Sequence, residues 1–113
     1  KSLPSVGAWT PEHGVSCPLI LPHSDKPLVV VSFYRAYLTA ADLAPITAIF
    51  AALRARGFQV LGLFAPSLKT PGAAEWMARQ IAHLRPAAIL KQFALNHKAF
   101  DQARKALFFA PYS

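Results

Sequence analysis

Three polar side chains follow directly after two apolar runs of the chain, and these residues are the best placed for chemistry. Arg35 comes after the run Leu28–Tyr34, and Ser67 and Lys69 come after the run Phe58–Ala65. Guanidinium, hydroxyl and ammonium groups all donate hydrogen bonds to carboxylate or phosphate oxygens. Arg35, Ser67 and Lys69 are therefore the candidate contacts for an acidic substrate.

The turns that carry these residues lack the glycines of a standard nucleotide site. Neither turn contains GxGxxG or GxxxxGK[ST], which argues against a dinucleotide or nucleoside triphosphate site of those kinds. Pairing of Arg35 with Asp42 across its own loop is a structural alternative, and we favour it over a ligand contact. No paired carboxylates, GxSxG elbow or HExxH motif are present, so no catalytic residue is assigned.

A second group of chemically capable side chains, His13, Cys17 and His23, lies near the start of the chain. Their spacing fits no zinc pattern because a second close pair of ligands is missing, and we expect loop residues and no bound metal. Cys17 is the single cysteine and cannot form an internal disulfide, which favours a cytoplasmic protein.

The elements that must position the candidate contacts alternate between strand and helix over residues 27–90. Strands are predicted at 28–34, 58–65 and 87–90, and helices at about 42–56 and 73–84. Crossovers that contain a helix join parallel strands with a right-handed connection. The prediction is an α/β fold, a three-layer βαβαβ unit with a Rossmann-like or flavodoxin-like parallel sheet. The carboxyl ends of its strands would hold the site.

The first helix has the clearest boundary signals. Asp42 or Thr39 can cap its start, and Pro45 suits its first turn. Gly57 supplies a left-handed residue that ends it.

The two flanking segments have different compositions. Residues 1–26 carry recurrent proline and glycine, which predicts an extended lead-in of turns rather than regular elements. Residues 91–113 predict an added C-terminal helix that Asn96 can cap. Three apolar strands would leave the sheet partly uncovered, so we expect self-association of the chain.

The chain carries a formal net charge of +7, and 54% of its residues are hydrophobic. Its lysines and arginines are scattered singly without an aromatic stacking pattern, so nucleic acid is not the expected partner. No apolar run reaches the length of a membrane helix. Residues 91–113 do carry a local excess of positive charge. This leaves open an alternative, an independent small basic binding module for an acidic partner such as RNA.

The order of short motifs resembles the CobN-type large subunit of aerobic, ATP-dependent cobaltochelatase, and the related large subunit of magnesium chelatase. The motifs are GAWTPEHG, a strand ending in FYR, LRARGF before a second strand, the turn PSLK, and a helix ending in LRPAAI. The resemblance covers most of residues 7–90. Residues 91–113 depart from the family pattern.

The resemblance implies that the chain is an internal piece of a much longer protein. That family inserts Co²⁺ into the tetrapyrrole hydrogenobyrinic acid a,c-diamide during cobalamin biosynthesis, with ATP hydrolysed by ATPase-type partner subunits. It implies as partners the rest of the large subunit, those ATPase subunits and the tetrapyrrole. The segment itself is expected to be non-catalytic, to bind no cofactor of its own, and to offer at most Arg35, Ser67 and Lys69 to a carboxylate-bearing substrate or a neighbouring domain.

Overall fold

The computed structural model describes residues 3–16, 21–67 and 69–92, and within these ranges the chain forms one sheet flanked by helices. In chain order the elements are β1 (Gly7–Thr10), β2 (Gly14–Ser16), β3 (Leu28–Tyr34), α1 (Ala36–Thr39), α2 (Ala44–Ala55), β4 (Gln59–Ala65), α3 (Ala73–Leu84) and β5 (Ala88–Gln92). The predicted C-terminal helix falls in residues 91–113, almost all of which lie outside the described residues.

The sheet has the strand order β2-β1-β4-β3-β5. β3 is parallel to both β4 and β5, so the three strands predicted from the sequence run in the same direction. β1, however, pairs antiparallel with β4 and with β2. The expectation of a wholly parallel, Rossmann-like or flavodoxin-like sheet is therefore wrong, because a hairpin from the N-terminal segment adds two antiparallel strands and makes the sheet mixed.

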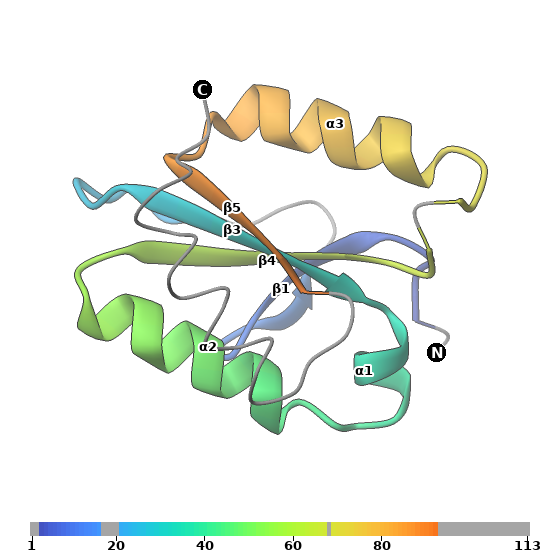
Figure 1. Ribbon diagram of the computed structural model, residues 1–113, viewed down its shortest axis with the longest axis horizontal. Helices are drawn as coiled ribbons and strands as arrows, with labels where there is room; N and C mark the ends of the chain where they lie inside the picture. Colours follow the sequence, from blue (N-terminus) through green and yellow to red (C-terminus); the bar gives the residue numbers. More distant parts are fainter. Residues whose placement is uncertain (1–2, 17–20, 68, 93–113) are drawn as a thin grey trace.

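Two helices cover opposite faces of this sheet (Figure 1). Side chains alternate along a strand, so β3 sends Val29, Val31 and Phe33 to the face under α2, and Leu28 and Val30 to the face under α3. The α2 side chains that close the first core are Ile46, Ile49, Phe50 and Leu53. β3 is apolar throughout because both of its faces are buried, as the continuous hydrophobic run predicts.

The hairpin is anchored in the α2-side core by one aromatic residue. Trp9 is 5% exposed, and its ring meets Phe50 edge-on at a centroid distance of 5.3 Å and Phe33 at 6.1 Å. Beneath it, a Cβ atom at Gly62 would lie 2.9 Å from both the Trp9 carbonyl oxygen and the Phe33 ring. Glycine at this position therefore allows β1 to pack closely against β4.

The helix boundaries follow the sequence signals with one exception. α2 has Pro45 in its first turn, and Gly57 adopts φ 91° just beyond its end, as predicted. The expected side-chain cap is wrong, because Leu43 occupies the N-cap position and no side chain caps the helix. Thr39 instead donates its hydroxyl to the Ala36 carbonyl oxygen in α1. In the described part of the chain, no helix has the length and apolarity needed to cross a membrane.

Candidate functional site

The carboxyl ends of β3 and β4 bring the predicted site residues to one rim of the sheet. Tyr34 is in register with Ala65, and the backbone N–H of the next residue, Arg35, donates to the Ala65 carbonyl oxygen at 2.8 Å. Ser67 follows two residues after Ala65 on the neighbouring strand. The sequence-based placement of Arg35 beside the Ser67 turn is thus reproduced by the backbone.

The Arg35 side chain is already engaged at this rim. Its Nε donates to the Pro4 carbonyl oxygen and its Nη2 to the Leu3 carbonyl oxygen, both at 2.8 Å. Figure 1 shows the segment before β1 passing near the end of β3 and α1. Arg35 and Asp42 form no salt bridge, so the alternative pairing is wrong, although Arg35 does make structural hydrogen bonds.

Ser67 and Lys69 build the turn that leads into α3. The Ser67 hydroxyl oxygen accepts from the Lys69 backbone N–H at 3.1 Å, and the Ser67 carbonyl oxygen accepts from the Thr70 N–H at 3.2 Å. Ser67 therefore shapes the loop, as serine does in turns. Lys69 is exposed, and its ammonium has no ion-pair partner among the described residues, which leaves it as the more accessible cation of the rim.

A groove of about 290 Å³ lies at the opposite end of the sheet, where the parallel strands begin. Its walls come from the β1–β2 turn, the segment before β3, and the junction of α2 with β4. The lining residues are Thr10, Glu12, His13, Leu21, Pro22, His23, Ser24, Lys26, Arg54, Phe58, Gln59 and Val60. No pattern in the sequence predicted this groove.

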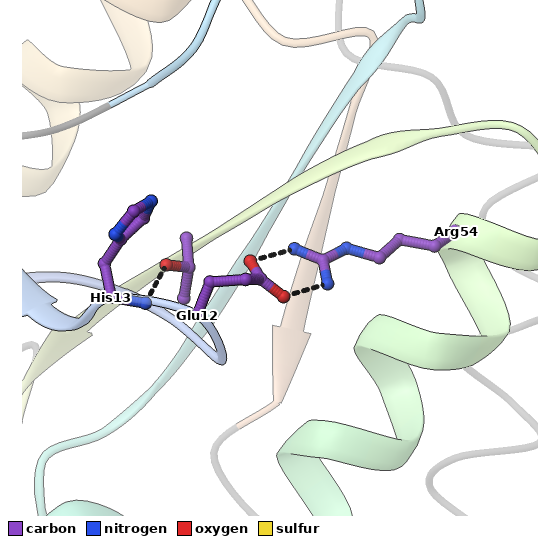
Figure 2. Close-up of polar contacts among 4 residues, drawn as sticks. Glu12, His13 and Arg54 are labelled. Atoms are coloured by element: carbon purple, nitrogen blue, oxygen red, sulfur yellow. Dashed lines mark hydrogen bonds and ion pairs between the residues drawn. The ribbon is translucent and has the colours of Figure 1, made fainter.

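An ion pair joins two of the lining residues, and Figure 2 shows Arg54 and Glu12 facing each other. Arg54 at the end of α2 makes two hydrogen bonds to Glu12 in the hairpin turn, 2.5 Å from Nη1 to Oε2 and 2.7 Å from Nη2 to Oε1. The guanidinium carbon also lies 5.5 Å from the centre of the Phe50 ring. The hydrogen bonds from Arg54 lower the pKa of the Glu12 carboxyl, and those to Glu12 raise the pKa of Arg54. The pair was invisible in the sequence because its members are 42 residues apart.

The histidines near this groove do not form a metal centre with other described residues. The His13 backbone N–H donates to the Thr10 hydroxyl oxygen at 3.2 Å (Figure 2), which fixes the hairpin turn. The exposed His23 ring lies 3.8 Å from an Asp25 carboxylate oxygen. Across residues 3–16, 21–67 and 69–92, no three histidine, cysteine, aspartate or glutamate side chains gather as metal ligands. Cys17, the third member of the sequence group, lies outside the described residues.

Comparison with known protein families identifies a match. The family model described as CobN/Magnesium Chelatase matches residues 3–108, which is nearly the whole chain. No curated protein and no solved structure shows significant similarity. The family match spans the hairpin, all three parallel strands and both large helices, and the rim and the groove both fall inside it. This chain therefore belongs to the CobN/magnesium chelatase family.

Proposed function

We propose that the chain is a segment of the large subunit of an ATP-dependent cobaltochelatase in the cytoplasm. The observation that carries this proposal is the family match over residues 3–108. The order and spacing of the motifs, among them FYR before α1 and PSLK after β4, resemble the CobN-type large subunit. In this role the metal ion is a substrate, and ATP is hydrolysed by separate partner subunits. Hydrogenobyrinic acid a,c-diamide is the tetrapyrrole that receives Co²⁺.

The segment itself contributes a framework and a contact surface rather than the metal-inserting chemistry. Chelation needs a base for the pyrrole protons and a path for the metal, and no described cluster of acids and histidines offers such a set. The rim does offer cations suited to the peripheral carboxylates of a tetrapyrrole or to an acidic neighbouring domain. Lys69 would make the direct contact, and Ser67 would hold the turn. Arg35 would contribute when its guanidinium donors are not bonded to Leu3 and Pro4.

Activity of the complete large subunit tests this proposal. The subunit, combined with its ATPase partners, ATP and Co²⁺, is expected to change the absorption spectrum of hydrogenobyrinic acid a,c-diamide as cobalt enters the ring. Mg²⁺ with a porphyrin serves as the comparison for the other branch of the family. Insertion of Mg²⁺ with no insertion of Co²⁺ would overturn the cobalt assignment.

The rim contact has its own variant and a matched control. Lys69→Glu reverses an exposed charge on the rim, and Arg79→Glu reverses an exposed charge on α3. Lys69→Glu should raise the KM for the tetrapyrrole roughly tenfold with little change in kcat, because it removes binding shared by ground and transition states. Arg79→Glu should leave both constants unchanged. Equal effects of the two substitutions would show a general response to charge and not a contact at the rim.

The same preparations test the RNA-binding alternative. A small basic module that binds RNA would lose affinity steeply as salt increases. We expect no binding of generic RNA at physiological salt, and strong salt-dependent binding would favour the alternative instead.

A further inference from the structure

The fork of donors on Arg35 is the polar feature of the rim with the most defined geometry. The Nε and Nη2 atoms lie on one edge of the planar guanidinium and point in nearly the same direction. Each donates to a different backbone carbonyl, Nε to Pro4 and Nη2 to Leu3, at 2.8 Å. Two neutral oxygens therefore occupy the positions that the two oxygens of one carboxylate would fill.

A second arginine in the chain shows how a guanidinium pairs with a carboxylate when one is present, although it uses its Nη1–Nη2 end and not the Nε–Nη2 edge. Arg54 holds both oxygens of Glu12 at 2.5 and 2.7 Å, in the paired geometry that planar acids prefer. Arg35 has no acid in this position. Asp42 lies in the loop after α1 and Glu75 lies in the first turn of α3, yet neither forms a salt bridge with Arg35. The chemistry of the fork is thus that of a carboxylate site occupied by weaker, neutral acceptors.

The segment that covers the fork has few other attachments. Leu3 is half-buried, and Pro4 and Ser5 are exposed. Val6 packs against the α3-side core, and strand pairing starts at Gly7. Within the described residues, the two bonds from Arg35 are the hydrogen bonds that hold Leu3 and Pro4. No strand pairing of the hairpin therefore involves residues 3–5.

We propose that the Nε–Nη2 edge of Arg35 is a carboxylate-binding site that residues 3–5 cover, and that a ligand carboxylate displaces them. A carboxylate gains more from a guanidinium than two neutral carbonyls do, because both partners then carry charge. Lys69 exposed on the same rim adds attraction for an anion. The inference deepens the proposed function and rests on it only for the source of the carboxylate, a tetrapyrrole substituent or an acidic residue of a neighbouring domain.

A titration with citrate tests the site without any chelatase activity. The full chain is titrated with citrate, and with sodium chloride at matched ionic strength, while its backbone amide and Arg35 Nε–Hε resonances are followed by NMR. We expect saturable shifts at Arg35 and at Leu3, Ser5 and Val6, with faster exchange of the Leu3 and Ser5 amide hydrogens as residues 3–5 leave the rim. Chloride should produce neither effect, because screening does not select the fork.

Substitutions distinguish binding by the paired donors of Arg35 from binding by positive charge alone. Arg35→Lys keeps the positive charge and loses the paired donors, and it should weaken citrate binding roughly tenfold. Arg54→Lys is the control and should leave citrate binding unchanged. Pro4→Gly should strengthen binding about twofold to fivefold, because a more flexible segment pays more entropy to cover the fork.

Three results would overturn the inference. They are the absence of saturable citrate binding, binding that Arg35→Lys leaves intact, and binding that shifts Arg35 but not residues 3–6. If citrate binds as described and the complete subunit inserts no Co²⁺, the proposed function fails and the carboxylate site stands. If Co²⁺ is inserted and citrate does not bind, the site fails alone.

Discussion

Glu12 and Arg54 show how a single pair of side chains ties together two distant parts of the chain. The pair joins the β1–β2 turn to the end of α2 and lines the groove that lies where the parallel strands begin. Both side chains remain partly exposed, 51% for Glu12 and 39% for Arg54, so water screens their attraction. The contribution of this ion pair to the stability of the fold is therefore small, and it depends on pH.

The pH dependence of this pair follows from the lowered pKa of Glu12. A carboxyl whose pKa is lower in the folded state contributes stability above its unfolded pKa, about 4.3, and this stability is lost as pH falls through the folded pKa. A double-mutant cycle with Glu12→Gln and Arg54→Gln should give a coupling of about 0.2–1 kcal/mol at neutral pH. Urea unfolding at about pH 3 should show that coupling diminished. A coupling of equal size at both pH values would contradict the assignment.

Gly62 is a position at which the fold favours glycine. A methyl group there would meet the Trp9 carbonyl oxygen and the Phe33 ring, each at 2.9 Å. Gly62→Ala should lower the free energy of unfolding by about 1–3 kcal/mol, because the backbone of β1 must move to relieve the contact. Gly7→Ala is the comparison, since the atoms nearest its new methyl belong to the Phe64 side chain, at 2.8 Å, and not to the backbone. Chemical denaturation of both variants checks the order, and an equal or larger loss for Gly7→Ala would count against it.

At the scale of elements, the hairpin β1–β2 is the part that sequence patterns did not predict. Both strands are short and lie between turn residues, and their four and three residues give no clear alternation. What makes Gly7–Thr10 a strand is the free edge of β4, a partner far along the chain. Tertiary pairing of this kind overrides local propensity and has no local signature.

The parallel strands and the two long helices were predictable for the opposite reason. Leu28–Tyr34 is buried on both faces, and α3 begins and ends at Ala73 and Leu84 as its periodic pattern indicates. The position of Arg35 at the rim followed from the strand alone. Its hydrogen bonds to Leu3 and Pro4 did not, because backbone carbonyls leave no trace in a residue pattern.

The anchoring of the hairpin can be tested with the two tryptophans. Trp9 is almost fully buried against Phe33 and Phe50, whereas Trp76 on α3 is only half-buried. Trp9→Ala should cost about 3–5 kcal/mol of unfolding free energy. Trp76→Ala removes the same ring from a less buried site and should cost clearly less. Urea denaturation monitored by circular dichroism compares them, and similar losses would mean that the hairpin is not held by Trp9.

At the scale of the whole molecule, the feature of interest is the pair of edges of the sheet. The hairpin occupies the free edge of β4, and β3 is the one strand that pairs with β5 among the described residues. Unpaired strand edges favour association between copies of a chain. The expected self-association stays a prediction. We assign it to the edge at β5, because β2 at the other edge has only three residues and short edge strands associate less readily.

Sedimentation velocity over a range of protein concentrations checks this assignment. We expect a concentration-dependent shift to larger species. Ala87→Lys should weaken that shift, because Ala87 is exposed just before β5 and an added lysine protects a strand edge. Ala82→Lys, which adds the same charge to an exposed position on α3, should not. A monomer at every concentration would disprove the prediction.

The pairing of β1 with β4 also sets an order of events during synthesis. Ala8 lies opposite Leu63, so apart from the neighbouring β2, strand β1 has no partner until β3, α2 and β4 have all been synthesised. Contacts between residues so far apart in sequence form late and slow folding. A nascent chain halted before Gln59 should therefore present Trp9 unprotected, and the hairpin should be the last part of the sheet to become resistant to protease.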